Sequence, residues 1–327
     1  MGIKGLTQLV KKNSPGSIEH KGLYTMKDKR IAIDTSIFLY KSLMNVRSKG
    51  DYLRNSEGKV VSHIQGLYYK TNQLLTFGIT PIYIFDGKPP VEKSDCIKSR
   101  VKKANECKEK MENTENPEEK KALEKGTIRI KKEYIDDLKH MFGLMGVSYI
   151  HAPGEAEAYA SELCRLGFVD AVMTEDMDTL SYGCPQLFRT CIDKSIKRPD
   201  IVTIFNFQKI LEDFKMNHDE FIDMCILCGC DYCPTIPKVG PVRAMKYIHK
   251  YKSIENLINS DEKINIPEEF KNKYIASRGL FKVFDGKIDL ENLPISKTKY
   301  DPDGIYKYLV NSCNMNVKRV QNSLQKF

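Results

Sequence analysis

The sequence lacks any long apolar segment, and this absence excludes several classes of protein. No stretch of the 327 residues approaches the roughly 20 apolar residues that a membrane-spanning helix needs. The first ten residues, MGIKGLTQLV, lack the apolar core of a secretory signal peptide, and Leu6 stands where the N-myristoylation pattern requires Ser or Thr. We therefore expect no association with membranes.

Disulfides are not expected either. Ten cysteines without a secretory signal indicate reduced thiols in an intracellular protein. Cys225, Cys228, Cys230 and Cys233 imitate a zinc site, but their two CxxC pairs lack the long spacer of a zinc ribbon. Cys225 and Cys228 share the apolar face of a predicted helix, so core packing is favoured and zinc binding is the alternative.

The composition is that of a soluble globular protein, with 41% hydrophobic and 29% charged residues. A net charge of +9 favours a polyanionic partner. A length of 327 residues allows one large domain or two modest ones.

Seven acidic residues lie at the ends of predicted strands, in turns or at a helix start, rather than on charged surface helices. They are Asp34, Asp86, Glu155, Glu157, Asp176, Asp178 and Asp231. The ends of parallel strands converge at one edge of a sheet, where each like-charged pair about 4 Å apart would cost roughly 4 kcal/mol. Oxygen ligands without histidine select Mg²⁺ or Mn²⁺, and two such ions flanking a phosphodiester can cleave nucleic acid. Singly, Asp34 or Asp86 is more simply explained as a helix cap or turn residue, so the joint pattern carries the prediction.

The apolar patterns predict an α/β protein. Strands are expected at 29–34, 81–85, 147–150, 170–174, 186–191 and 201–204, helices at 36–47, 63–77 and 155–166, and mostly helix from 206 onward. A loop is expected at 48–62.

Residues 92–139 differ in character from their surroundings, because 26 of the 48 residues are charged, 14 basic and 12 acidic. One interpretation is a solvated helical hairpin with NTENPEE as its turn. The other is a helical arch or lid with a function of its own. The sequence does not decide between them.

A second candidate site is the segment TIPKVGPVRAMKYIHKYKS. A tight turn at residues 239–241 opens a helix that carries Arg243, Lys246, Lys250 and Lys252. Backbone N–H groups at such a helix start can bind a phosphate without reading a base. An ordinary Gly-Pro helix start is the alternative. Tyr40 could stack on a nucleobase, although core packing is the more common fate of such a residue.

The motifs MGIKGLTQL, IAIDTSIFLY, YIFDGKPP, APGEAEA, TEDMDTL, CGCDYC and VGPVRA resemble those of eukaryotic-type flap endonucleases, in the same order and at similar spacing. These enzymes belong to the structure-specific nuclease superfamily that includes the xeroderma group G nuclease. The resemblance covers nearly the whole chain, to about residue 320. It implies a PIN-like α/β fold, with a central mixed, mostly parallel sheet flanked by helices, a helical arch and a helix–two-turn–helix element.

The resemblance also implies an organisation. A single nuclease domain would span 1–327, with an N-terminal region at 1–104 and an arch at 92–139. The internal nuclease region would be 122–253, with the helix–two-turn–helix near 233–253, and 254–327 would form a C-terminal helical region.

By the same resemblance, the seven acids would bind two Mg²⁺ ions, which Mn²⁺ can replace, and Lys93 and Arg100 would neutralise the scissile phosphate. Residues implied in DNA binding are Gly2, Tyr40, Arg47, Lys93, Arg100, Gly240, Arg243, Lys250 and Lys252. Main-chain atoms of Thr235, Ile236 and Val239 would hold a K⁺ ion. Two departures from the family, Lys238 for Gly and Val242 for Lys, affect this K⁺ and duplex site but not the acidic centre.

The implied function is metal-dependent cleavage at the base of 5′ flaps on duplex DNA in replication and repair, with 5′–3′ exonuclease activity. The alternatives are a 5′ exonuclease, a gap endonuclease, an RNA-cutting relative or a non-enzymatic DNA-binding protein. We expect a monomer that acts in a nucleus or at a viral replication site. Gln321, Leu324 and Phe327 fit a truncated sliding-clamp peptide, but an ordinary amphipathic final helix is favoured.

Overall fold

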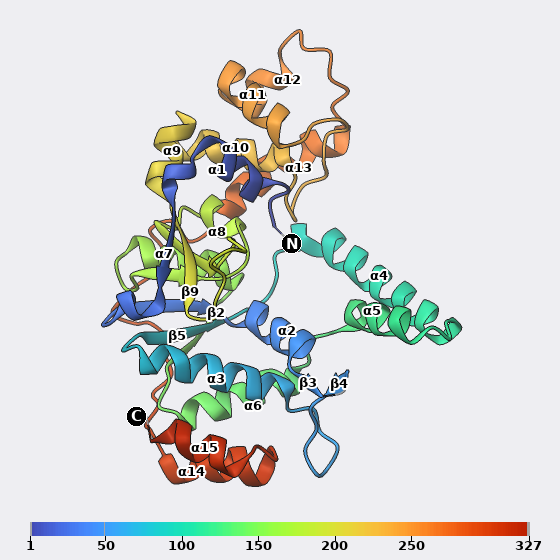
Figure 1. Cartoon of the computed structure of the whole chain (residues 1–327). Coiled ribbons are helices and arrows are strands. Elements are labelled where there is room, and N and C mark those ends of the chain that lie inside the picture. Colours follow the sequence, from blue (N-terminus) through green and yellow to red (C-terminus); the bar gives the residue numbers. More distant parts are fainter. Residues whose placement is uncertain (1, 49, 326–327) are drawn as a thin grey trace. The chain divides into compact units, whose positions relative to one another are not determined.

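The computed structural model describes residues 2–48 and 50–325, which divide into two compact units (Figure 1). Each unit is assembled from three separate segments of the chain. The first unit comprises Met1–Thr25, Gly87–Cys96 and Ala152–Leu293. The second comprises Met26–Asp86, Ile97–His151 and Pro294–Phe327.

The second unit contains three parallel strands in the order β2–β5–β6. They are β2 (Arg30–Asp34), β5 (Thr80–Phe85) and β6 (Tyr149–His151). In β2 and β5 all residues after the first are buried, the pattern of strands covered on both faces. The helices that accompany them are α2 (Thr35–Asn45), α3 (Ser62–Thr76), α6 (Lys132–Leu144), α14 (Pro302–Lys307) and α15 (Val317–Leu324). A π-helical turn, η4 (Tyr308–Ser312), follows α14.

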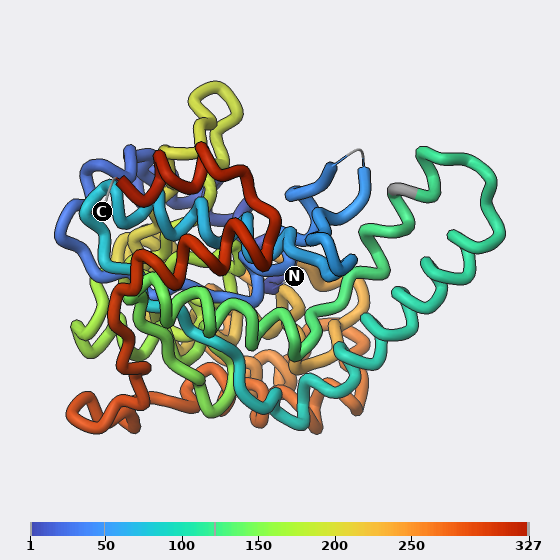
Figure 2. The backbone as a smooth tube through the Cα atoms, turned by 90° about the horizontal axis from the view of Figure 1, so that it is seen from below, coloured from blue at the N-terminus to red at the C-terminus, as the bar shows by residue number. Residues whose placement is uncertain are grey.

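The charged insert forms two helices, α4 (Ser94–Asn113) and α5 (Pro117–Thr127), which lie side by side as the teal and green segments at the right of Figure 2. The side chain of Asn116 accepts hydrogen bonds from the first N–H groups of α5 and so ends the turn. A Cβ on Gly126 would lie 2.7 Å from Sγ of Cys107, so the two helices touch near their tip. The helical-hairpin interpretation therefore describes the local structure.

The first unit contains four strands in the order β1–β9–β8–β7. They are β1 (Ile18–Gly22), β9 (Ile201–Asn206), β8 (Gln186–Thr190) and β7 (Ala171–Met173). Only the β7–β8 pairing is parallel here. Three of the five pairings within the two units are parallel, so the predicted mixed, mostly parallel α/β class is confirmed. The helices are α1 (Leu6–Asn13), α7 (Ala156–Arg165), α8 (Asp178–Ser181), α9 (Phe207–Phe214), α10 (His218–Cys228), α11 (Pro241–Tyr251), α12 (Ile254–Ile258) and α13 (Glu268–Phe281).

The predicted elements occur within about two residues of their expected bounds, but four elements were not predicted. The strand β1 and the helix α1 are among them. The other two are the short strands β3 (Arg47–Ser48) and β4 (Asp51–Tyr52), which pair inside the segment expected to be a loop.

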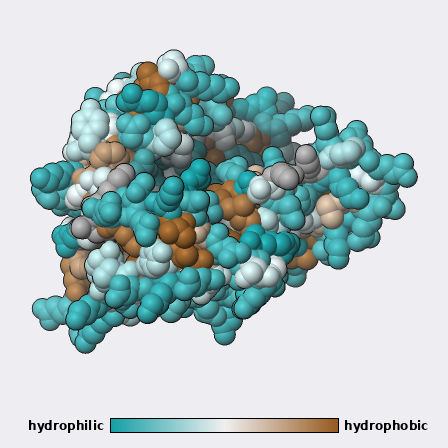
Figure 3. All heavy atoms as spheres, turned by 60° about the horizontal axis from the view of Figure 1, so that its bottom comes forward, coloured by the Kyte–Doolittle hydropathy of each residue, from teal (hydrophilic) through white to brown (hydrophobic). Residues whose placement is uncertain are grey.

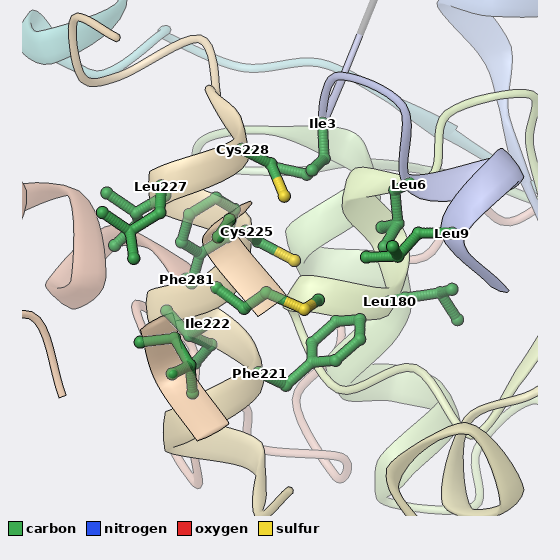
Figure 4. Packing of buried hydrophobic residues seen from close by; sticks show 14 of the residues in the cluster. Ile3, Leu6, Leu9, Leu180, Phe221, Ile222, Cys225, Leu227, Cys228 and Phe281 are labelled. Carbon is green, nitrogen blue, oxygen red and sulfur yellow. The ribbon is translucent and has the colours of Figure 1, made fainter. Parts of the chain in front are cut away.

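A large apolar core occupies the first unit and holds α10 at its centre. Figure 4 shows Cys225 and Cys228 among Ile3, Leu6 and Phe221. Burial raises the pKa of the Cys225 thiol well above its usual value and that of Cys228 to about 12, so both are neutral thiols at physiological pH. Among residues 2–48 and 50–325, no group of cysteines meets the geometry of a metal site. The structure therefore agrees with core packing rather than zinc binding.

The last helix, α15, is amphipathic and packs within the second unit. Val320 is fully buried, and the hydroxyl groups of Ser323 and Tyr68 are hydrogen-bonded. Of the predicted clamp peptide, Gln321 is exposed and Leu324 is half-buried, whereas Phe327 lies outside the described residues. The favoured interpretation, an ordinary final helix, describes this segment.

The face of the molecule in Figure 3 is mainly hydrophilic, with apolar residues in small groups. Within the described part of the chain, no helix combines the length and the apolar character needed to cross a membrane.

Replacing Cys225 by serine should lower the free energy of unfolding by about 1–3 kcal/mol, because a hydroxyl would be buried at a position with 0% exposure. Urea denaturation measures this loss. Metal analysis of the purified protein should find no stoichiometric zinc. One zinc ion per chain, lost in the variant, would contradict the core assignment.

Candidate metal centre and nucleic-acid interface

Five of the seven predicted acids belong to the first unit. Glu155 is the residue before α7 and Glu157 lies in its first turn. Asp176 and Asp178 follow β7, and the Asp178 N–H donates to Asp176 Oδ1 at 3.1 Å, which is the Asx turn expected of such a pair. Asp231 lies in the loop after α10.

Lys93 shows that three of these acids converge. Its ammonium group is hydrogen-bonded to the Glu155 carboxylate, and its side chain is only 13% exposed. Burial on its own would lower the pKa of Lys93, but the charges of Glu157, Glu155 and Asp231 outweigh this effect and raise it. Lys93 is therefore a permanent cation inside the acidic cluster, as its predicted role requires.

Asp178 carries the largest electrostatic cost. It is 2% exposed, and its carboxylate accepts a hydrogen bond from the backbone N–H of Ile3. Burial raises its pKa well above the usual range, and the charges of Asp176 and Asp231 raise it further. The Ile3 N–H offsets part of this cost. A bound divalent cation would offset far more of it.

The glycine at position 2 packs against the same two aspartates. Its φ of +84° is in the left-handed region, and a Cβ there would lie 1.9 Å from Asp176 Oδ1 and 2.6 Å from Asp178 Oδ1. No side chain fits this space. The expectation that the N-terminal residues lie at the acidic centre is thus met within the first unit.

The other two acids, Asp34 and Asp86, follow neighbouring strands of the second unit. Asp34 pairs in register with Ile84, two residues before Asp86. Asp34 is the N-cap of α2 and accepts the Ile37 N–H at 3.3 Å, which is the cap interaction that its position favoured. Ser36, which the sequence analysis did not single out, donates a hydrogen bond to Asp86.

The chain passes directly from Asp86 to Gly87, whose N–H donates to the carbonyl of Gly154 at 2.8 Å. This contact holds Asp86 beside the segment that carries Glu155. One carboxylate oxygen from each of Asp86, Glu155 and Glu157 lies within 4.8 Å of the others. Three oxygen ligands without cysteine or histidine fit a hard cation such as Mg²⁺.

Two tyrosines line the buried side of this cluster, and sequence reasoning missed both. The hydroxyl groups of Tyr182 and Tyr232 are hydrogen-bonded to each other. Burial, followed by the charge of Glu157 on Tyr232 and by each ring's effect on the other, raises both pKa values, so the rings stay neutral. Tyr232 lies within the motif CGCDYC, where the neighbouring Asp231 drew all the attention.

The remaining predicted DNA residues of the second unit lie on or near its helices. Tyr40 is half-buried rather than in the core, and its hydroxyl donates to the Lys125 carbonyl at 3.4 Å. Arg47 pairs with Glu124 at 2.8 Å and lies 4.4 Å from the centre of the Tyr52 ring. Arg100 is half-buried on α4.

A separate basic surface lies on α11 in the first unit. Gly240 is the N-cap of this helix, with Pro241 at the first helical position. Arg243, Lys246 and Lys250 are exposed on one side, whereas Ala244 and Ile248 are buried on the other. This arrangement presents cations and free helix N–H groups together, as phosphate binding requires.

The three residues implied in K⁺ binding form the turn before α11. The Val239 N–H donates to the Ile236 carbonyl at 3.1 Å, and both side chains are buried, whereas Thr235 is exposed. Lys238 adopts a φ of +64°, the left-handed conformation that glycine adopts most readily. The departure from the family's glycine is therefore accommodated at some strain. Lys252, with φ of +69°, ends α11 and pairs with Glu220 at 3.5 Å.

Comparisons with known proteins agree with this geometry. Residues 1–107 match the XPG N-terminal domain and residues 146–231 match the XPG I-region. Flap endonuclease 1 of Glycine max is 39% identical over 332 residues, covering 100% of this chain and 86% of that protein. The flap endonuclease 1 of Debaryomyces hansenii is 38% identical, with 100% and 88% coverage.

Solved structures share the fold. Flap endonuclease-1 from Methanococcus jannaschii is 27% identical with a TM-score of 0.68, covering 94% of each chain. The catalytic core of Rad2 in complex with DNA substrate has a TM-score of 0.74 at 20% identity and covers 99% of each chain.

Replacing Gly2 by alanine should lower the rate of any reaction at this centre by about tenfold or more, because the added methyl group must displace Asp176 or Asp178. Single-turnover kinetics measure this loss. Gly167 is the matched control, since its φ of +74° imposes the same backbone strain with no atom within 4 Å of the added Cβ. Equal effects of both substitutions would contradict the close approach.

Divalent ions should stabilise the protein more as the pH rises. Without metal, the raised pKa of Asp178 means that the folded state holds a proton that the unfolded chain releases above the usual aspartate value of 3.8. Stability therefore falls as the pH rises above that value, and Mg²⁺ bound to the folded state offsets the loss. The increase in Tm caused by Mg²⁺ should be larger at about pH 8 than at about pH 5.

The variant Asp178→Asn removes the charge and should show a smaller dependence on pH. A Tm increase that is identical at both pH values in the unaltered protein would rule out this linkage.

Proposed function

The chain belongs to the nuclease family of XPG and flap endonuclease 1, and on that premise we propose that it cuts the phosphodiester at the base of 5′ single-stranded flaps on duplex DNA. The proposal rests above all on one observation, the convergence of acidic side chains around Lys93 beside the N-terminal residues. The enzyme is a metal-dependent nuclease of DNA replication and repair. Its cellular place of action follows as the nucleus, where its eukaryotic relatives would meet replicating DNA.

The seven carboxylates would hold two Mg²⁺ ions, with Asp86, Glu155 and Glu157 as one group of ligands. Bound ions of this kind supply Lewis acidity, activate water and stabilise the charge of the leaving oxygen. The residues of the chain do the remaining work. Lys93 and Arg100 draw the scissile phosphate toward the carboxylates and balance its charge.

Other residues position the substrate. Tyr40, half-buried and hydrogen-bonded through its hydroxyl, presents a ring on which an unpaired base can stack. The α4–α5 hairpin acts as the arch beneath which the flap passes. Hydrolysis gives a 5′-phosphate and a 3′-hydroxyl, and no side chain is needed as a covalent nucleophile.

The duplex would bind at the start of α11. Backbone carbonyls of Thr235, Ile236 and Val239 share a K⁺ ion with a DNA phosphate, and Arg243 lies one helical turn further on. Replacing K⁺ by Li⁺, which is too small for this ring of carbonyls, should weaken duplex binding in fluorescence anisotropy. Unchanged affinity would contradict the K⁺ site.

The sliding-clamp contact is proposed only in its truncated form. The exposed side chain of Gln321 is available for it, whereas Leu324 is half-buried and would have to leave the surface of its own unit.

A labelled double-flap DNA tests the function directly. In Mg²⁺ and K⁺ the unaltered protein should cut once near the flap base, and Asp178→Ala should lose at least about a thousandfold in rate, because the ion site loses a ligand. Asp303→Ala, an exposed carboxylate on α14, is the control and should cut normally.

Gapped duplexes, recessed 5′ ends and RNA flaps serve as competing substrates in the same assay. Faster cutting of one of these would change the substrate, while binding without cutting in both Mg²⁺ and Mn²⁺ would overturn the proposal.

A further inference from the structure

A cavity of about 310 Å³ in the first unit opens next to the acidic centre. Its wall includes Glu155, which also belongs to the predicted ion site, and Ala158 one turn further along α7. Tyr182, Tyr232 and Phe284 provide most of the remaining surface, and Lys88 lies at the edge. The volume falls within the range of small-molecule sites. None of the roles assigned above uses this space.

The walls suit a flat apolar group. Tyr182 and Tyr232 are 5% and 2% exposed, and their hydroxyls are occupied with each other, so the cavity meets their ring surfaces rather than their polar ends. Phe284 is fixed edge-on against Tyr159, with ring centres 5.3 Å apart. Three aromatic residues held in this way form a rigid, neutral surface on which another ring can pack.

The edge of the cavity carries the opposite character. Lys88 is exposed there, and the Lys93 ammonium group lies 6.0 Å from the centre of the Tyr232 ring. A ligand that fills the cavity would therefore place its apolar part among the rings and a negative group beside the lysines and the ion site. A nucleotide has these two parts, a planar base and a phosphate, joined by a short sugar.

We propose that this cavity receives the base of one unpaired nucleotide adjoining the scissile phosphate. This inference rests on the proposed function, since it concerns the substrate of that site. Glu155 borders both the cavity and the ion site, so a phosphate at the ions leaves its own base within reach of the cavity. Because the walls offer ring surfaces and few polar groups, the site accepts any base and contributes no sequence preference.

The base would serve to position the substrate. Withdrawing one base from the stack separates the nucleotide at the cut from its partner strand and fixes its phosphate relative to the carboxylates. Tyr40 belongs to the other unit and would stack on a different base.

The test is abasic scanning of a double-flap DNA, with one base removed at a time around the cut site. In the unaltered protein, one position should slow single-turnover cleavage about tenfold, in line with the loss of one stacked base. Phe284→Ala should slow cleavage of the intact flap and lose its sensitivity to that one abasic position. Tyr40→Ala should remain sensitive to it, which separates the two stacking sites.

Two further variants guard against a general loss of structure. Ile275→Ala, at a position 61% exposed on α13 and outside the cavity wall, should behave as the unaltered protein. Val283→Asp introduces a charge at a wall position that is 36% exposed, and it should reproduce the effect of Phe284→Ala.

A binding measurement provides a readout that needs no turnover. With Asp178→Ala and Ca²⁺, 2-aminopurine at the sensitive position should lose fluorescence on binding as it stacks in the cavity, and adding Phe284→Ala should restore it. If no abasic position slows cleavage, or if the loss is equal in Phe284→Ala and the unaltered protein, the cavity receives no base. Failure of the unaltered protein to cut an intact flap would instead overturn the proposed function.

Discussion

Mutual repulsion among buried carboxylates is the constraint on which this structure depends. Asp178 is almost fully buried near Asp176 and Asp231, and all three carry the same charge when ionised. Lys93 balances part of that charge through its contact with Glu155. The backbone N–H of Ile3 balances another part. Divalent cations supply what these two cannot, so the requirement for metal follows from the stability of the site as well as from its chemistry.

The rest of the first unit holds these charges in place. The N-terminal residues reach the centre because Ile3, Leu6 and Leu9 pack into the same core as α10 (Figure 4). The Lys4 N–H also donates to the Gly229 carbonyl at 3.1 Å, just before Asp231. One apolar core therefore positions Gly2, Asp178 and Asp231 together, and it leads directly into the turn and helix that present Arg243 to a phosphate.

Much of this could be predicted from the sequence, where local pattern and tertiary environment agree. The runs RIAID and PIYIFD are apolar at nearly every position and form the buried strands β2 and β5. The strand β1 could not be found in this way, because its sequence IEHKG alternates only weakly and its backbone pairs at an edge with β9. The four-residue helix α8 is likewise too short to leave a periodic signal.

The site shows the same division. Each acid follows a strand or opens a helix, so its position could be read from the chain, and the resemblance supplied Gly2 and Lys93. The contacts among residues distant in sequence could not be read in this way. The Tyr182–Tyr232 pair, the Ser36–Asp86 bond and the aromatic cavity beside Glu155 all depend on tertiary packing, which local patterns do not encode.

The account can be tested most directly by counting the divalent ions bound per chain. Electron paramagnetic resonance of Mn²⁺ titrated into the protein in the presence of flap DNA measures this number. The account predicts two ions per chain, with Asp178→Asn losing at least one of them. A chain that binds no Mn²⁺ under these conditions, or that binds equally well without the Asp178 carboxylate, would contradict the claim that these acids exist to hold cations.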